Sequence, residues 1–409
     1  MAGCMGFDEQ DDSVIEAQAL SVRSGISNNR PIRNHLGASA SFSTDGFVNL
    51  TSAFFQDFGT NGRTCGTCHS PAAGWGISAR NVRRRFARTR GRDPIFRLVD
   101  GANSPDADVS TLRDRREAYS MLLTYGTLRI GIGIPEDAEF ELIDVDDPYG
   151  FASADQLSLF RRPLPAANLP FIPAVMWDGR ETRDTLEAGL MGQANGATLG
   201  HAQAEEPLTD AEQHEIVDFE LAMFSAQIIS RRAGRLDRTV DGGPEFLAYQ
   251  PLVVGPFDIF DNWQGRGGKK GAIARGQKLF NEGDGHGNRC SLCHATANVG
   301  SPAAFGFLDI GTAAGSRRPP GFPLYTLRNI ETGETITSTD PGRALITGKW
   351  ADINHFKGAV LRGLASRAPY FHNGMAATLT DVVDFYEESL GFDFTEDQEA
   401  DLVAFLGAI

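Results

Sequence analysis

CGTCH at residues 65–69 and CSLCH at residues 290–294 are two copies of the pattern C-x-x-C-H. In this pattern the two thiols form thioethers to the vinyl groups of a haem, and the adjacent histidine binds its iron. The composition of the chain gives about 0.001 expected matches by chance, so two copies are not accidental. The sequence therefore predicts two covalently bound haems c, the first held by Cys65, Cys68 and His69 and the second by Cys290, Cys293 and His294.

Cysteine pairs at this spacing also occur in thioredoxin-like redox sites and in zinc sites. Thioredoxin-like chemistry does not require the histidine that follows each pair. The chain has five cysteines, too few for a four-thiolate zinc site at each motif. Haem attachment is therefore the favoured interpretation.

The length and composition of the chain restrict its class. A length of 409 residues suits two domains of average size, and 41% hydrophobic with 22% charged residues is a normal globular balance. No run of about 18 uninterrupted apolar residues is present, so the sequence predicts no membrane-spanning helix. The net charge of -15 argues against a nucleic-acid-binding surface and weakly favours basic or neutral protein partners.

Haem c is attached outside the bacterial cytoplasm, so we expect a periplasmic or otherwise extracytoplasmic protein. The first residues, Met1 to Cys4, resemble the end of a lipoprotein signal whose apolar part has been removed, which would make Cys4 a lipid-bearing residue. A functionally silent thiol is an equally good interpretation of Cys4. A lipid anchor is thus one of two open alternatives.

The region before each haem motif follows the same plan. Residues 47–58 are a short apolar helix candidate before the first motif, and residues 272–280 are a helix candidate before the second. A helix that leads into C-x-x-C-H is how class I cytochrome c domains begin. Residues 1–45 are polar and are expected to be a tether or a wrapping arm.

Each domain should also end on a helix that packs against its first one. Capping boxes at Thr209 and Thr395 start two such helices, and the weakly structured run 241–244 separates the two domains. We therefore predict a mainly α fold with two class I cytochrome c-like domains, residues 46–240 and 250–409, each with one covalent haem c. The apolar faces of the closing helices hold Ile216, Phe219, Met223 and Phe224 in the first and Leu402, Phe405 and Leu406 in the second.

A long insertion, at about residues 75–170, interrupts the first domain. Within it, residues 129–134 and 139–145 alternate between apolar and polar side chains and flank a turn at residues 135–137. This alternation around a turn predicts a β-hairpin.

The iron of a catalytic haem needs an open or openable face, whereas the iron of an electron-transfer haem has two protein ligands. Between His69 and His201 the sequence contains no histidine, and the methionines in this span are Met121, Met176 and Met191. The first haem thus lacks an obvious second histidine in its own loop, which favours an open iron.

Two further segments resemble motifs of the bacterial di-haem cytochrome c peroxidase and MauG family. PFIPAVMWDGR at residues 170–180 resembles the family's F-W-D-G-R segment, and RAPYFHNG at residues 367–374, with ATL at 377–379, resembles its P-Y-F-H-D-G…A-T-L segment. With both haem motifs in the family's order, the resemblance covers residues 50–409 apart from the insertion. It implies an enzyme that reacts with hydrogen peroxide at the first haem and exchanges electrons through the second.

The resemblance also implies roles for single residues. Trp177 matches the tryptophan that lies between the two haems, and a core tryptophan is the simpler alternative. Tyr386 stands where the peroxidases have the methionine that binds the second haem and where MauG has a tyrosine, and Met375 is the competing ligand. A phenolate ligand stabilises ferric iron and lowers the potential, which favours a MauG-like enzyme that reacts in the all-ferric state.

Peroxide cleavage also needs a group that moves a proton between the two oxygens. The family's distal loop supplies Gln and then Glu, and the resemblance places Gln193 and Gln203 at these positions. A glutamine cannot carry protons, so His201, with Glu205 and Glu206 as alternatives, is the candidate for this role. A structural histidine is the other interpretation of His201.

The family's calcium site between the domains uses an asparagine and a threonine, and Arg162 and Arg367 stand at those places. Two cations do not bind a third, so calcium is expected to be absent.

The sequence is compatible with three functions. The first is a di-haem oxidoreductase that reduces hydrogen peroxide with electrons from a small cytochrome c or a cupredoxin, or from an oxidisable protein or organic substrate. The second is an electron-transfer cytochrome in which two protein ligands close each iron. The third is an oxygenase that uses molecular oxygen.

Overall fold

The computed structural model describes residues 24–303 and 306–409. Within these residues the chain forms helices and five small antiparallel sheets. Helix accounts for about 33% of the fold and strand for 17%, so the fold contains more strand than the expected mainly α architecture. In the described part of the chain, no helix has the length and apolar composition that a bilayer span requires.

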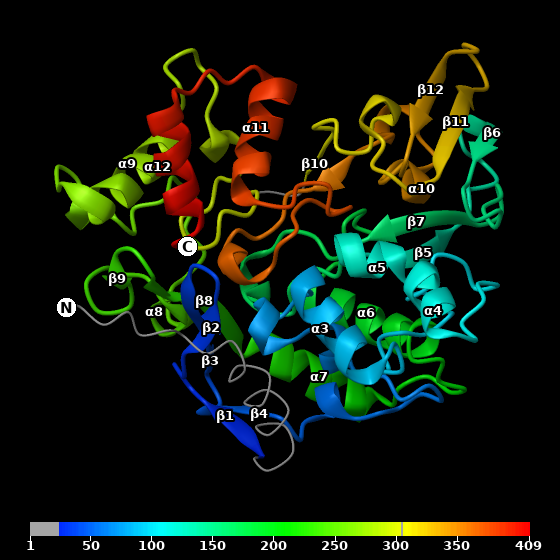
Figure 1. The fold of residues 1–409 in the computed structure, drawn as a ribbon, viewed down its shortest axis with the longest axis horizontal. Coiled ribbons are helices and arrows are strands. Elements are labelled where there is room, and N and C mark those ends of the chain that lie inside the picture. Colours follow the sequence, from blue (N-terminus) through cyan, green and yellow to red (C-terminus); the bar gives the residue numbers. More distant parts are fainter. Residues whose placement is uncertain (1–23, 304–305) are drawn as a thin grey trace.

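Helices α9 (Gly268–Glu282) and α12 (Glu396–Leu406) form the core of the second half. They lie side by side in Figure 1, and α11 (Leu379–Leu390) packs against α12. The buried rings of Phe280 and Phe405 lie 5.4 Å apart between their centroids. The helices predicted at residues 272–280 and after the capping box of Thr395 are therefore confirmed.

The close approach of α9 and α12 depends on Gly276. A Cβ atom at this position would lie 1.9 Å from the carbonyl oxygen of Asp401. Glycine has no Cβ, so the two backbones can touch here. Nε of the neighbouring Arg275 lies 2.6 Å from the carboxylate of Asp401, which reinforces the same crossing.

The first half begins differently from the expectation. Residues 47–58 do not form a helix, because Phe47–Asn49 is strand β4 and Ala53–Phe55 is a single 3-10 turn. Strand β4 pairs with β1 (Gly25–Ser27), and Phe54 is fully buried. The apolar side chains of this segment are thus covered by partners far along the chain, and the predicted helix is wrong.

Helix α7 (Asp210–Leu221) begins at the predicted capping box of Thr209 and ends before Met223. Met223–Ser230 is strand β8, which pairs with β3 (Gly37–Ser43). The expectation that Met223 and Phe224 continue the helix face is therefore wrong. They are buried in a sheet, because β3 offers their backbone the hydrogen bonds of a strand partner.

Residues 24–45, the described part of the expected tether or arm, belong to the body of the fold. Strands β3 and β8 are the inner strands of a four-stranded sheet, with β2 (Ile32–Asn34) and β9 (Gly234–Arg235) at its edges. Nδ2 of Asn34 donates a hydrogen bond to Oγ of Ser366 at 2.9 Å, so this segment contacts both halves of the chain. Cys4 and its two interpretations lie outside the described residues.

The insertion contains three helices, α3 (Ala79–Thr89), α4 (Leu112–Ala118) and α5 (Ser120–Tyr125). Its strand β5 (Leu128–Ile132) pairs with β7 (Leu157–Arg161), and both strands begin at buried leucines. This pair lies at the edge of cores that belong to both halves of the chain.

Strand β6 (Phe140–Asp146) pairs with β11 (Leu324–Asn329), which also pairs with β12 (Thr335–Ser338). Figure 1 shows β6, in teal, beside β11 and β12, in gold. The predicted hairpin between residues 129–134 and 139–145 is therefore wrong. The alternation identified both strands but not their partners, because the apolar face of β6 packs against buried residues of β11 in the second half.

The remaining helices and strands are α2 (Cys65–Cys68), α6 (Leu186–Gly200), α8 (Pro244–Ala248), α10 (Ala344–Thr347), β10 (Phe307–Leu308) and β13 (Phe356–Lys357). Strands β10 and β13 pair with each other.

Candidate functional site

The first C-x-x-C-H motif borders a large cavity, called cavity 1. The motif lies on helix α2, and Cys65, Cys68 and His69 line the cavity. Nδ1 of His69 donates a hydrogen bond to the Trp75 carbonyl at 3.0 Å, which leaves Nε2 as the ring nitrogen available to a metal. The cavity encloses about 1460 Å³ of space that opens to solvent.

Cavity 2 repeats this arrangement at the second motif. Cys290, Cys293 and His294 line it, and Nδ1 of His294 donates a hydrogen bond to the Gly300 carbonyl at 2.5 Å. The space enclosed is about 1580 Å³. Each cavity is thus large enough for a bulky group and presents two thiols and one imidazole nitrogen to it.

The motif cysteines do not have the chemistry of redox thiols. The four described cysteines are free of disulfides. Burial raises the pKa of Cys65 and of Cys290 to about 12, whereas reactive thiols have pKa values lowered to about 3.5–7.5. The thioredoxin-like alternative therefore does not fit these pairs.

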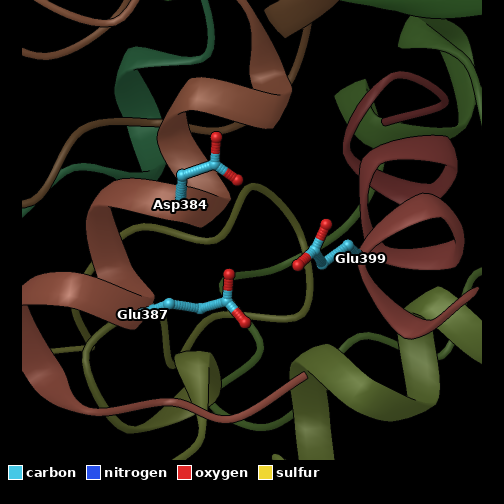
Figure 2. A group of neighbouring side chains, drawn as sticks. All are labelled: Asp384, Glu387 and Glu399. Carbon is cyan, nitrogen blue, oxygen red and sulfur yellow. The ribbon is translucent and has the colours of Figure 1, made fainter. Parts of the chain in front are cut away.

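The motif side chains do not converge on a small ion either. In the described part of the chain, the one group of three His, Cys, Asp or Glu side chains with ligand atoms within 4.8 Å of one another is Asp384, Glu387 and Glu399. Figure 2 shows these carboxylates, from α11 and α12, facing one another. None of the three lines either cavity. The zinc alternative at the cysteine motifs therefore has no convergent ligand set.

The two cavities share one wall. Residues 162–165, Trp177, Lys357 and Val360 line both cavities. Nε1 of Trp177 donates a hydrogen bond to the Arg162 carbonyl at 2.7 Å, which fixes the indole in this wall. Trp177, which the family resemblance places between two haems, thus lies between the two cavities.

Buried basic side chains, two at this wall and two in cavity 2 alone, test whether haem fits the cavities. Arg162, Lys357 and Arg367 form no ion pair within residues 24–303 and 306–409, and burial lowers their pKa values, to about 9, 7 and 10 respectively. Nε of both arginines and Nε2 of the buried His372 have no hydrogen-bond partner among the same residues. Buried charges and polar atoms need partners. The wall therefore fits a group that carries carboxylates, as haem does in its propionates.

Helix α6 contributes polar side chains to cavity 1. Gln193 and His201, two of the expected distal residues, line the cavity from this helix and its C-cap. Gln203 does not line it: this residue is exposed, and its Oε1 accepts a hydrogen bond from Nδ2 of Asn61 at 3.1 Å. Gln203, whose φ is 57°, is thus not brought to the cavity lining, and its distal role stays a prediction.

Two buried carboxyl groups were not expected from the sequence, one lining cavity 1 and one in contact with His201. Glu220 lines the cavity, burial raises its pKa to about 8, and its Oε2 has no hydrogen-bond partner in the described chain. It follows Ile216 by one helical turn, so a carboxyl on the apolar stripe of α7 was an available signal. Asp100 contacts His201 and lies in the insertion, where nothing in the sequence pointed to it.

The structure separates the rival ligands that the sequence offered. Tyr386 lines cavity 2, and Met375 does not. Tyr386 packs against Phe371 at a centroid distance of 5.9 Å, and burial raises the pKa of its phenol. Of the three methionines named for the first haem, Met176 lines cavity 1, whereas Met121 and Met191 do not.

No protein-family model matches the sequence. Curated proteins that are similar to it include cytochrome c peroxidases and MauG. Cytochrome c551 peroxidase of Nitrosomonas europaea is 28% identical over 241 residues, covering 57% of this chain and 60% of the relative. Cytochrome-c peroxidase IdrP1 of Denitromonas iodatirespirans is 30% identical over 268 residues, covering 59% of this chain and 66% of the relative. Methylamine utilization protein MauG of Methylophilus methylotrophus is 26% identical over 283 residues, covering 63% and 70%.

The chain spans about 60% of the length of the Nitrosomonas relative. Among solved structures, a MauG-like protein associated with microbial copper homeostasis superposes with a TM-score of 0.37 and 17% sequence identity, covering 63% of this chain and 75% of that chain. The cavities with their C-x-x-C-H motifs, together with the sequence relatives, define a haem c protein. The chain is similar to bacterial cytochrome c peroxidases and to MauG.

Proposed function

We propose that the chain is a di-haem c oxidoreductase that reduces hydrogen peroxide at its first haem with electrons passed through its second. The bound haems supply the electrons that break the oxygen–oxygen bond. The protein supplies the attachment groups, which are Cys65, Cys68 and His69 in cavity 1 and Cys290, Cys293 and His294 in cavity 2.

The wall that the two cavities share carries this proposal. Trp177 borders both cavities and is held there by its hydrogen bond to the Arg162 carbonyl. Electrons that enter at the second cavity then have one aromatic side chain to cross on the way to the first. A shared wall with an aromatic side chain would serve no purpose in a protein whose two haems react independently.

Cavity 1 is proposed as the peroxide site because its polar groups suit that ligand. The amide of Gln193 can donate a hydrogen bond to a peroxide oxygen, and the imidazole of His201 can exchange a proton with it. In cavity 2 the phenol of Tyr386 is proposed as the second protein ligand of the haem, which leaves this haem to exchange electrons only.

The proposed electron donor is a small cytochrome c or a cupredoxin in the periplasm or another extracytoplasmic compartment. A phenolate ligand from Tyr386 would lower the potential of the second haem, which favours reaction in the all-ferric state and makes an oxidisable protein or organic substrate the alternative donor. Calcium is not part of the proposal, because Arg162 and Arg367 bring two guanidinium groups to the place where the family binds it.

Rapid mixing of the ferric, haem-loaded protein with hydrogen peroxide tests the proposal. We expect a fast change of the haem absorption bands without any reductant. A change that requires prior reduction of one haem would identify a reductively gated peroxidase instead. Haem absorption bands that stay unchanged in both the ferric and the partly reduced protein would contradict the proposed enzymatic function.

An electron-transfer cytochrome is the second candidate, and Met176 is the observation that favours it. Met176 lines cavity 1, so its sulfur could close the first iron. Cyanide binding to the ferric protein separates the two functions, because an open iron binds cyanide quickly. If Met176 is a ligand, wild-type binding is slow and Met176→Leu accelerates it, whereas for an open iron the two proteins bind cyanide equally fast.

A further inference from the structure

His201 is held at cavity 1 by a charged residue from outside its own helix. It is the C-cap of α6, and its Nδ1 lies 2.5 Å from Oδ2 of Asp100. The His201 side chain is 36% exposed and lines the cavity, whereas the Asp100 side chain is 3% exposed. The imidazole thus reaches the cavity while its rear nitrogen is bound to a buried carboxylate.

Arg63 fixes Asp100 from the other side. Nη1 of Arg63 lies 2.5 Å from Oδ1 of Asp100. Nε of Arg63 donates to the Pro94 carbonyl and Nη2 donates to the Ile95 carbonyl, each at 2.8 Å. Nη1 also donates to the His201 carbonyl at 3.2 Å, so one buried guanidinium holds both members of the pair.

These contacts decide which ring nitrogen of His201 carries the proton. Burial works to raise the pKa of Asp100, but the hydrogen bond with His201 and the charge of Arg63 outweigh it and hold the pKa below its usual value. An ionised carboxylate only accepts hydrogen bonds, so Nδ1 of His201 must be the donor. In the neutral form of the ring Nε2 then carries the lone pair, and it is the nitrogen left to the cavity.

We propose that Asp100, fixed by Arg63, is the positioning residue that makes His201 the proton-transfer group of cavity 1. The proposal rests on the peroxide reduction proposed above. It assigns to His201 the proton transfer that a glutamine at position 203 cannot perform. Without the negative charge of Asp100, the proton of the ring moves to Nε2. The nitrogen left to the cavity then donates a hydrogen bond and cannot accept a proton.

The proton balance of the step is simple. Nε2 of His201 takes a proton from one peroxide oxygen and returns it to the other, which leaves as water when the oxygen–oxygen bond breaks. Two electrons come from the bound haems and are replaced by the electron donor. Two protons from solvent complete the second water.

Asp100→Asn tests the proposal, because it keeps the shape of the side chain but removes its charge. Arg63 only donates hydrogen bonds and so holds the amide oxygen on its own side, which leaves the amide NH₂ to donate to Nδ1 of His201. We expect this variant to react with peroxide at least about tenfold more slowly than wild type, and His201→Gln about 10²–10⁴-fold more slowly. If Asp100 acts through His201, the double variant is no slower than His201→Gln. Equal rates in wild type and Asp100→Asn would overturn the proposal.

The matched control is Glu187→Gln. Glu187 lies 3.3 Å from Nδ1 of His214, and this exposed carboxylate–histidine pair lines neither cavity. Loss of its carboxylate should leave the peroxide rate unchanged.

The tautomer of His201 is a readout that does not depend on activity. The chain has eight histidines, so nitrogen NMR of histidine-labelled, reduced and carbon monoxide-saturated protein gives a tractable spectrum. We expect the His201 proton on Nδ1 in wild type and in Glu187→Gln, and on Nε2 in Asp100→Asn. A wild-type proton on Nε2 overturns the proposal even if Asp100→Asn fails to fold. A wild type that keeps the Nδ1 proton but does not react with peroxide contradicts the proposed function alone.

Discussion

The side chain of Glu220 shows how the interior of cavity 1 departs from an ordinary core. Its carboxyl is buried on the apolar face of α7, and burial raises its pKa to about 8. In the described residues no cation pairs with it, so the neutral form is the stable one at neutral pH. A carboxyl that keeps its proton at this pH can donate a hydrogen bond into the cavity.

Glu220 should make the stability of the protein depend on pH. Between about pH 4.5 and 8 the unfolded chain releases the Glu220 proton while the folded chain keeps it, so the free energy of unfolding falls as the pH rises through this window. Each pH unit within this window lowers the free energy of unfolding by about 1.4 kcal/mol. We expect Glu220→Gln to gain on the order of 3 kcal/mol relative to wild type between pH 5 and pH 8, measured by denaturant unfolding. Parallel pH curves for the two proteins would contradict an ionisation at this site.

Tyr386 should set the potential of the second haem. Tyr386→Phe keeps the ring contact with Phe371 but removes the oxygen that is proposed as a ligand. We expect the potential of that haem to rise by on the order of 100 mV, since a phenolate favours ferric iron. Redox titration followed by absorption measures this shift. Met375→Leu is the matched control, and a shift in this variant in place of Tyr386→Phe would identify the thioether as the ligand.

At the residue scale, the sequence predicts groups whose chemistry is part of a motif. The cysteines and histidines of C-x-x-C-H and Trp177 all line the cavities where their motifs imply. Gln203 comes from counting along a family motif, and this residue is exposed and outside the cavity 1 lining, so its distal role stays a prediction. The role of Asp100 could not be predicted from the sequence, because only the folding of the insertion brings this residue to His201.

At the scale of helices and strands, local signals were sufficient where the element is stabilised locally. Helices α7, α9 and α12 follow from capping boxes and from apolar residues one turn apart. The helix predicted at residues 47–58 is wrong because a short apolar run fits a strand as well as a helix. The predicted hairpin is wrong because alternation of apolar and polar side chains defines a strand but not its partner. Strand β6 pairs with β11, which lies about 180 residues later in the chain.

The crossing of α9 and α12 should be sensitive to a single methyl group. In Gly276→Ala the new Cβ would lie 1.9 Å from the Asp401 carbonyl, so the helices must move apart. We expect a loss of about 1–3 kcal/mol in the free energy of unfolding, measured with denaturant. Gly196→Ala in α6 is the control, because nothing lies within 4 Å of its Cβ position and a gain of about 0.5–1 kcal/mol is expected there. A Gly276→Ala protein as stable as wild type would show that the crossing is not tight.

At the scale of the whole molecule, the two halves are built into each other. The sheet of β6, β11 and β12 takes strands from both halves, and the strands near the N-terminus contact both. Nε of Arg161 in the first half lies 2.6 Å from Asp340 in the second, and its Nη1 lies 2.5 Å from Asp178. The sequence predicted two haem domains, but such connections between them depend on long-range pairing that no local pattern records.

The buried Arg161 cluster should therefore affect the stability of both halves at once. Asp340→Asn leaves Arg161 with one fewer carboxylate in a fully buried position, and we expect a loss of about 3 kcal/mol in the free energy of unfolding. The loss should appear in a single transition that haem absorption and circular dichroism report together. Asp146→Asn, at the exposed pair with Arg318, should change nothing. Two separate transitions would show that the halves unfold as independent domains.

The wall of Trp177 and residues 162–165 also limits how the protein can be controlled. Because the cavities share this wall and strands cross between the halves, the gap between the two cavities is fixed by the fold rather than by a hinge. If the cavities hold the two proposed haems, electrons tunnel across this wall over a constant distance, and the rate of their transfer should be the same in dilute buffer and in viscous glycerol solutions. Under the proposed function, control of turnover is then left to the entry of peroxide and the docking of the electron donor at the outer edges of the cavities.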